Sequence, residues 1–331
     1  MVKMSKERRS AGRRAMIAGA AALSVLVIAG GVHAQNDRPV KFILPVATAS
    51  GVDTIVRSAQ PALSKAFGVP VVVENQPGAG GIVGTQALVK SAPDGTTLSF
   101  VSNNHVIYPS VYKSLPFDPV ADITPIAVVG STPIVLVVNP KVPAKNAQEL
   151  IALMKAKPDE LNYASSGNGT ILHLAAAMFL DQAGVKAKHI PYKGVGPMIT
   201  GLLGGEVDFG TLALPSVQQH IKSGALRAIG VGAPKRIAAA PDIPTMVEQG
   251  MPNYLVEGWF AVIGPAKMAP ATVDRINAEV KAAFASPDVV DAMAKQGNVI
   301  DVSTPEHAAK FFPAELAKYA ALVKKAGVEL Q

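Results

Sequence analysis

Two glycine-rich turns carry small polar side chains at points where a strand gives way to a helix. In the stretch LNYASSGNGTILHLAAAMF these residues are Ser165, Ser166, Gly167, Asn168, Gly169 and Thr170. Backbone N–H groups are exposed at a helix N-terminus, and with hydroxyl groups beside them they suit a carboxylate or a phosphate. Ordinary N-capping by Ser, Asn or Thr explains the same residues equally well, so both interpretations stay open.

The other turn lies early in the chain, within LPVATASGVDTIVR. It follows an apolar strand over 40–45 and leads into a helix near Asp53, so it repeats the same geometry. Ligands of open α/β sheets bind outside the carboxyl ends of the strands, which is where both turns fall. The candidate ligand-binding residues of this turn are Val46, Ala47, Thr48, Ala49, Ser50, Gly51 and Asp53.

Asp53 has two interpretations. Its carboxylate can stabilise the helix N-terminus through the helix dipole, or it can accept a hydrogen bond from a ligand ammonium group. We favour the first, because acidic residues are commonplace in first turns. Ser102 and Asn103 after a third strand, and Thr211 after VDFG, are further ligand-binding candidates, although turn formation explains each of them as well.

A third glycine-rich stretch, VVVENQPGAGGIVG over 71–84, raises the question of a phosphate-binding loop. Its glycines at 78, 80, 81 and 84 are not in the GxGxxG register, and no GxxxxGK[ST] motif occurs, so nucleotide binding is not supported. We expect instead a tight turn that lets a helix pack close to its strand.

Catalytic and metal-binding patterns are missing after residue 34. Neither GxSxG nor HExxH occurs, and the histidines at 105, 173, 189, 220 and 307 show no close metal-ligand spacing. A triad of Ser166, His173 and an aspartate can be drawn, but His173 falls on an apolar helix and is expected to be a packed residue. The chain has no cysteine, which excludes disulfides and thiolate sites. We therefore expect no catalytic residue, no metal and no cofactor.

The first 34 residues have the layout of an export signal. MVKMSKERRSAGRR carries six basic residues before the apolar run AMIAGAAALSVLVIAGG, and Val32-His33-Ala34 offers a cleavage site. We predict a signal peptide over 1–34 and export by the Sec or the twin-arginine route. This segment contributes +5 of the formal net charge of +7, which leaves about +2 for the mature chain. Nucleic acid is therefore not an expected partner.

Short apolar strands alternate with helix-length periodic segments through most of the remaining chain. Such alternation predicts an α/β fold with βαβ crossovers and mainly parallel sheets, and the length suits two domains. Strands are predicted at 40–45, 71–75, 97–102, 133–139, 161–165, 188–192 and 226–231. Helices are predicted at 53–67, 80–91, 147–155, 169–182, 197–203, 215–222, 270–285, 287–296 and 305–326. The last three helices are expected to wrap back over an earlier sheet.

Seven segments, in order, carry a resemblance to a known family. They are ENQPGAGGIVG, SAPDGTTLSF, LPFDPVADITPIAVV, LNYASSGNGTILHLAA, HIPYKGVGPMITGLLGGEVDFG, IKSGALRAIGV and PDIPTMVEQGMPNY. Together they resemble the Bug-type extracytoplasmic solute-binding receptors of tripartite tricarboxylate transporters, from about Pro39 to the C-terminus.

The resemblance implies a type II-like periplasmic binding protein fold, in which two α/β domains are joined by two crossing strands and enclose a ligand cleft. We place one domain at 35–137 plus 258–331 and the other at 138–257. The resemblance also implies a periplasmic receptor that closes on a small organic carboxylate and delivers it to the permease subunits of a membrane transporter. A monomer is the default expectation.

In the family, the loop after the first strand and the YASxGxGS region bind the ligand carboxylate. These regions correspond here to Val46–Asp53 and Ser165–Thr170. Family members usually read close to PFAPGGGTD where this chain has PVATASGVD, so we hypothesise an altered ligand preference. Two alternatives stay open: a receptor that signals to a sensor kinase, and a periplasmic enzyme on the same fold.

Overall fold

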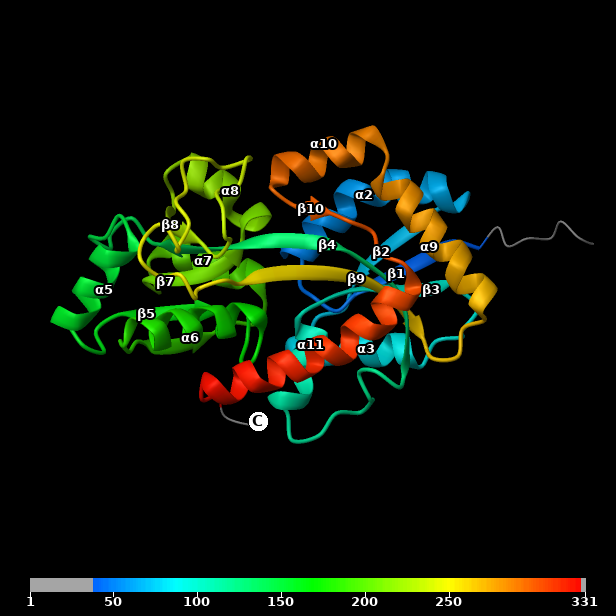
Figure 1. The fold of residues 1–331 in the computed structure, drawn as a ribbon, viewed down its shortest axis with the longest axis horizontal. Helices are drawn as coiled ribbons and strands as arrows, with labels where there is room; N and C mark the ends of the chain where they lie inside the picture. The colour runs from blue at the N-terminus through cyan, green and yellow to red at the C-terminus, as the bar shows by residue number, and fades with distance from the viewer. Residues whose placement is uncertain (1–37, 329–331) are drawn as a thin grey trace, which may run out of the picture. The chain divides into compact units, whose positions relative to one another are not determined.

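The computed structural model describes residues 38–328, so the predicted signal peptide over 1–34 lies outside the described residues. From Val40 onward the described residues form one compact unit. Its strands join in a sheet of order β2-β1-β3-β9-β4-β7-β5-β6, and β8 and β10 also pair with β4 (Figure 1). The strands are β1 Val40–Leu44, β2 Val71–Asn75, β3 Thr97–Ser102, β4 Ile123–Val138, β5 Asn162–Ser165, β6 Lys188–Pro191, β7 Phe209–Ala213, β8 Arg227–Val231, β9 Glu257–Pro265 and β10 Val299–Ile300.

Parallel strands form the two outer parts of the sheet. β1 is parallel to β2 and β3, and β5 is parallel to β6 and β7. These pairs confirm the predicted βαβ units and the α/β class. The antiparallel strands β4 and β9 lie between them, and β4 pairs with β9 along Ile123–Pro133 and with β7 along Ile134–Val138. The strand β4 therefore belongs to both parts of the sheet.

Apart from the short helix over 104–107, which was not predicted, the α-helices agree with the prediction to within a few residues. They are α2 Gly51–Phe67, α3 Ile82–Val89, α4 Asn104–Ile107, α5 Ala147–Ala156, α6 Ile171–Ala183, α7 Val195–Gly204, α8 Leu214–Lys222, α9 Pro270–Phe284, α10 Pro287–Gln296 and α11 Pro305–Lys325. Helices α2 and α6 end at Gly68 and Gly184, which are left-handed at φ 68° and 62°. Only glycine adopts that conformation without a Cβ penalty, so these ends are readable in the sequence.

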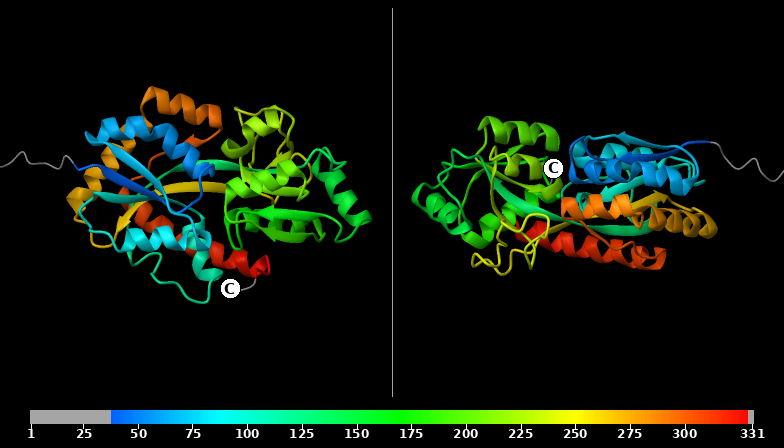
Figure 2. Two further views of the ribbon diagram at one scale, coloured as in Figure 1. Left: turned by 180° about the vertical axis from the view of Figure 1, so that it is seen from behind. Right: turned by 90° about the horizontal axis from the view of Figure 1, so that it is seen from above.

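The C-terminal helices return to the first part of the sheet, as predicted. Helices α9 and α10 pack against α2, and α11 packs against β4. Figure 2 shows the orange helices next to the blue N-terminal elements.

The buried side chains form two apolar clusters. One includes Phe42, Phe100 and Phe284 around β1 and β3. The larger includes Phe179 and Phe209 in the second part of the sheet, but it also contains residues on the other side of the predicted limits, such as Val101 and Phe312. The domain limits at 137 and 258 therefore do not separate two cores, and they stay a prediction.

Three strands and the first part of a fourth were not predicted. No strand was expected at β7, at β9 or at the two-residue β10, and β4 begins at Ile123 rather than at 133. Every residue of β7, and every residue of β9 after Glu257, is buried. Strands buried on both faces lack the alternation of apolar and polar residues that marks a half-exposed strand, so this pattern could not reveal them.

Candidate ligand-binding cavity

A cavity of about 530 Å³ lies where the loop after β1, the turn after β5 and the loop after β6 meet. The following predicted residues line it: Val46, Ala47, Ser50, Gly51, Ser102, Asn103, Ser166, Gly167, Asn168 and Thr170. The other predicted residues do not line it: Thr48, Ala49, Asp53, Ser165, Gly169 and Thr211. The two turns, both expected at the carboxyl ends of their strands, thus line one cavity.

The N-terminus of α2 contributes hydrogen-bond donors to this cavity. Gly51 and Val52 line it and belong to the first turn of the helix, where N–H groups have no intrahelical acceptor. Ser50 caps the helix, because its Oγ accepts a hydrogen bond from the Asp53 N–H at 3.1 Å. The hydroxyl hydrogen of Ser50 stays available for another acceptor, and Ser50 itself lines the cavity.

The carboxylate of Asp53 holds the turn before α2 in place through hydrogen bonds. Its Oδ2 accepts from the Ala49 N–H at 3.0 Å, and its Oδ1 accepts from Arg57 Nε at 2.8 Å and from Asn75 Nδ2 at 2.9 Å. The side chain is buried and its oxygens are occupied. This arrangement favours the structural interpretation of Asp53 over contact with a ligand ammonium group.

The N-terminus of α6 faces the same cavity. Thr170 caps this helix, since its Oγ1 accepts from the His173 N–H at 3.3 Å and donates to the Gly167 carbonyl at 2.9 Å. The Ile171 N–H donates to Asn104 Oδ1 at 2.9 Å, while Leu172, next in the first turn, also lines the cavity. Capping is therefore observed here, and it leaves first-turn donors beside the cavity.

Three predicted residues lie behind the cavity wall and hold the turn after β5. The Oγ of Ser165 lies 2.7 Å from His189 Nε2 and accepts from the Gly167 N–H at 3.2 Å. The hydroxyl of Thr211 donates to the Leu172 carbonyl at 2.6 Å. The Gly169 N–H donates to His173 Nδ1 at 3.0 Å. Ser165, the last residue of β5, is buried, whereas Ser166, the first residue of the turn that follows, lines the cavity.

His173 and His189 stack with ring centroids 3.9 Å apart. Burial lowers the pKa of His173 to about 3, with a further contribution from nearby His189, and burial lowers the pKa of His189 to about 4. Both rings are therefore neutral at neutral pH. The triad drawn from the sequence does not form, because the Ser166 hydroxyl donates to Thr170 Oγ1 at 3.2 Å and His173 accepts from Gly169. The expectation that His173 is a packed histidine is confirmed.

Asn103 joins the cavity to the strand β9 and the helix α11. Its Oδ1 accepts from the Trp259 N–H at 2.8 Å. Its Nδ2 donates to the Tyr319 hydroxyl at 2.5 Å and to the Glu257 carbonyl at 3.3 Å. These three bonds occupy the side chain, so Asn103 organises the wall of the cavity.

The glycines over 78–84 pack a helix, as the sequence analysis expected. A Cβ on Gly84 would lie 2.7 Å from the Gln76 carbonyl oxygen and 2.9 Å from the Cα of Pro45. Glycine at this position therefore allows α3 to pack closely against the loop after β1. Gly78, Gly80 and Gly81 also line the cavity.

The loop over 192–194 is a part of the cavity that sequence reasoning missed. Lys193 is the one charged side chain among the residues that line the cavity, and no Asp or Glu lines it. A Cβ on Gly194 would lie 2.6 Å from the Cβ of Ala47, so this glycine permits the loop to approach the turn after β1. The segment PYKGVGP was noticed in the sequence, but nothing in it showed which distant turn it meets.

Within residues 38–328, no group of three or more His, Cys, Asp or Glu side chains is arranged to hold a metal ion. The same described part of the chain contains no helix that is both long enough and apolar enough to cross a membrane.

The fold and the cavity define a periplasmic binding protein: an α/β receptor with a ligand-sized cavity lined from both parts of the sheet. The family described as "Tripartite tricarboxylate transporter family receptor" matches residues 55–328. The chain belongs to this family and, as its motifs predicted, is a Bug-type receptor.

Several known proteins are similar over nearly the whole chain. Protein BugT of Bordetella pertussis is 36% identical over 296 residues, which are 89% of this chain and 91% of BugT. The solved structure of the periplasmic binding protein BugD has a TM-score of 0.85 at 31% identity and covers 89% of this chain and 100% of BugD. Rpa4515 of R. palustris, solved with adipate, has a TM-score of 0.85 at 27% identity and covers 89% of this chain and 99% of its own. These similarities confirm the predicted fold class.

Proposed function

We propose that this protein is an exported receptor that binds a small organic carboxylate in the cavity and delivers it to the permease of a tripartite tricarboxylate transporter. One observation carries the ligand class. The first turns of two helices, α2 and α6, line a cavity that contains a lysine and no carboxylate side chain. The positive ends of two helix dipoles favour an anion there.

The proposed ligand contacts follow from the donors that line the cavity. A carboxylate oxygen would accept from first-turn N–H groups such as those of Gly51 and Val52, and from the free hydroxyl hydrogen of Ser50. Ser166 and Asn168 offer polar side chains from the opposite turn. Lys193 would add a positive charge that attracts the carboxylate and offsets part of the cost of removing it from water.

The proposed binding mechanism is closure of two domains around β4 and β9. The turn after β1 and the loop over 192–194 belong to different predicted domains, and glycines bring them together. Rotation about β4 and β9 would separate these loops and admit the ligand. The domain limits at 137 and 258 belong to this proposal.

The ligand is proposed by class only. Rpa4515 was solved with adipate, which supports a carboxylate, but the loop PVATASGVD differs from the usual family sequence. The position of Ser50 at the cavity supports the hypothesis that this difference alters ligand preference. The exposed position of Thr48, outside the cavity, does not.

We also propose that the protein binds and releases its ligand without chemistry. The closest pair of a hydroxyl and an imidazole at this site, Ser165 and His189, lies behind the wall, with Ser165 fully buried. A nucleophile there could not reach a ligand in the cavity. Export to the periplasm and a monomeric state complete the proposal.

Thermal unfolding of the purified protein against a panel of organic acids tests this function, with the amide of each acid as the matched control. A ligand that binds only the folded state stabilises it by about 2.7 kcal/mol at 100 times Kd. We expect one acid to raise the melting temperature while its amide does not. Equal shifts from an acid and its amide, or consumption of the acid during incubation, would contradict the proposal.

A further inference from the structure

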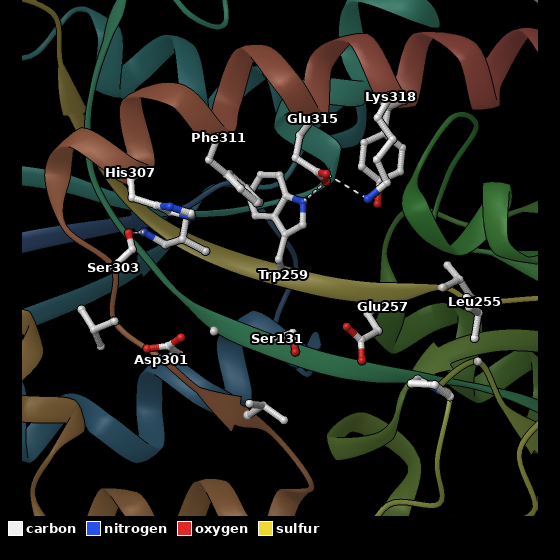
Figure 3. Close-up of a pocket in the computed structure, with 18 of the residues that line it drawn as sticks. Ser131, Leu255, Glu257, Trp259, Asp301, Ser303, His307, Phe311, Glu315 and Lys318 are labelled. Atoms are coloured by element: carbon white, nitrogen blue, oxygen red, sulfur yellow. Dashed lines mark hydrogen bonds and ion pairs between the residues drawn. The ribbon is translucent and has the colours of Figure 1, made fainter.

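A second hollow of about 830 Å³ lies on the opposite face of β4 and β9 from the ligand cavity. Ser131 and Glu257 line this hollow, whereas their neighbours Thr132 and Gly258 line the ligand cavity. This alternation is expected because successive residues of a strand face opposite sides. We call this hollow the rear groove. Figure 3 shows it between β4, the segment 299–304 and helix α11.

The floor of the rear groove contains aromatic side chains and one ion pair, between Glu315 and Lys318. The ring of Trp259 packs edge-on against Phe311 with centroids 5.1 Å apart. The indole Nε1–H of Trp259 donates to Glu315 Oε2 at 2.7 Å, and Lys318 Nζ lies 2.9 Å from Glu315 Oε1 (Figure 3). Glu315 and Lys318 therefore neutralise each other.

The rim of the rear groove exposes apolar side chains. Leu255 is 51% exposed and Val299 is 61% exposed, and both line the groove. Large apolar side chains on the rim of a hollow, with polar groups beside them, are typical of a surface that binds another molecule.

Two carboxylates of the rear groove are not in an ion pair, although Lys318 is near enough to Glu257 to attract it. Among the described residues, the side chains of Glu257 and Asp301 form no hydrogen bond and no ion pair. Burial raises the pKa of Glu257, because desolvation outweighs the attraction of Lys318. With Glu315 paired to Lys318, the groove is left acidic, while the ligand cavity on the other face contains a lysine and no acid.

We propose that the rear groove is the docking site for an Arg or Lys side chain, flanked by apolar residues, on a segment of the membrane permease. A basic side chain combines a cation for Glu257 and Asp301 with an apolar stem that can lie over Trp259. The flanking apolar residues would cover Leu255 and Val299. A free metal or ammonium ion would leave this apolar rim exposed, so a protein segment fits better. The choice of the permease rests on the proposed transport function.

The rear groove is also placed to report the state of the ligand cavity. Trp259 lines both hollows, and Asn103, on the cavity wall, bonds to the Trp259 N–H and to the Tyr319 hydroxyl in the groove. Rotation about β4 and β9 that opens one face of these strands narrows the other. A partner in the groove would therefore distinguish the two states of the receptor.

Trp259 is the sole tryptophan of the chain, so a change of tryptophan fluorescence comes from this residue, which lines the rear groove and the ligand cavity. The test uses protein purified from the periplasm of an expression host. The probe is the peptide acetyl-Leu-Arg-Leu-amide, and the matched control is the same peptide with citrulline, which has the shape of arginine without its charge. Neither peptide has a carboxylate, so neither imitates a ligand of the cavity.

We expect a saturable change of Trp259 emission with the arginine peptide and at least about fivefold weaker binding of the citrulline peptide. The double variant Glu257→Gln, Asp301→Asn should bind the arginine peptide more weakly than the unaltered protein, by a similar factor. The control Asp242→Asn, an exposed carboxylate outside the groove, should leave it unchanged. The melting temperature of each variant confirms that it folds.

Equal binding of the two peptides would overturn the inference. So would unchanged binding to the double variant, or the lack of a saturable response up to about 10 mM peptide, ten times the concentration at which binding is worth about 4 kcal/mol. Failure of the proposed function is separate: it would appear as no stabilisation by any organic acid, while peptide binding stayed intact.

Discussion

The Oδ2 of Asp53 accepts a hydrogen bond of 3.0 Å from the N–H of Ala49, a non-glycine residue in the left-handed region at φ 63°. A buried carboxylate thus holds a strained turn at the mouth of the proposed ligand site. The same carboxylate binds Arg57 and Asn75, so the turn, the helix α2 and the strand β2 depend on one side chain.

Replacing Asp53 should weaken both the fold and the ligand site. In Asp53→Ala, the Ala49 N–H, the Arg57 guanidinium and the Asn75 amide each lose one hydrogen bond at a part-buried position, and each such bond contributes about 0.5–1.5 kcal/mol. We expect the free energy of unfolding in urea to fall by about 2–4 kcal/mol, and ligand affinity to fall with it. Asp242→Ala is the matched control and should change neither quantity. If Asp53→Ala unfolds like the unaltered protein, Asp53 does not anchor the turn.

Ala49→Gly should stabilise the protein. A left-handed alanine costs about 1–2 kcal/mol relative to the right-handed form, a cost that glycine does not carry, although glycine loses more backbone entropy on folding. We expect a gain of up to about 1 kcal/mol in urea unfolding. The control Ala66→Gly, within the helix α2, should instead lose about 1 kcal/mol. Losses of equal size at both positions would show that Ala49 is not strained.

Ser50→Ala and Thr48→Ala should separate the two hydroxyls of the PVATASGVD loop. Ser50 caps α2, so the loss of its hydroxyl should lower the free energy of unfolding by about 1 kcal/mol. Ser50 also lines the cavity, so the same change should lower ligand affinity by about tenfold. Thr48 is exposed and outside the cavity, so Thr48→Ala should leave affinity unchanged. Isothermal titration with the acid identified by thermal shift measures both. Full affinity in Ser50→Ala would remove the hydroxyl from the proposed site.

Stability should fall as the pH is lowered below about 6.5, partly because of buried histidines. Burial lowers the pKa of His105 to about 4, and the pKa values of His173 and His189 are about 3 and about 4. These pKa values lie below that of a histidine in the unfolded chain, which is about 6.5. Between the two values the unfolded chain binds more protons than the folded protein, so the free energy of unfolding rises with pH. Above about pH 6.5 the histidines are neutral in both states and do not affect the free energy of unfolding. As the pH falls from about 6.5 towards about 3, this free energy decreases by about 1.4 kcal/mol for each pKa unit by which a histidine is shifted.

The double variant His173→Gln, His189→Gln isolates the contribution of the stacked pair. Urea unfolding at intervals between pH 4 and 7.5 should give a flatter dependence on pH than in the unaltered protein. His220→Gln, on the helix α8 and with its side chain partly exposed, is the control and should leave the slope unchanged. Parallel curves for all three proteins would mean that the buried pair does not titrate as its burial requires.

Local sequence determined the βαβ elements and the ends of several helices. Gly68 and Gly184 mark helix ends, and Ser and Thr before a periodic run mark helix starts, because both effects act within one turn of the chain. The ordered motifs likewise identified the family, since each is a short segment. The strands β7 and β9 were missed because burial on both faces removes the periodic signal.

Only the tertiary structure decided which polar residues face a ligand. Ser165 and Ser166 are neighbours of the same kind, yet Ser165 ends β5 and is buried, while Ser166 begins the turn and lines the cavity. Lys193 and Gly194 reach the turn at Ala47 through a crossover whose end point no local pattern specifies. The rear groove depends on the same fact, because β4, β9 and α11 come together only when the chain folds. Short-range rules determined the elements, and the long-range packing of those elements determined both proposed binding surfaces.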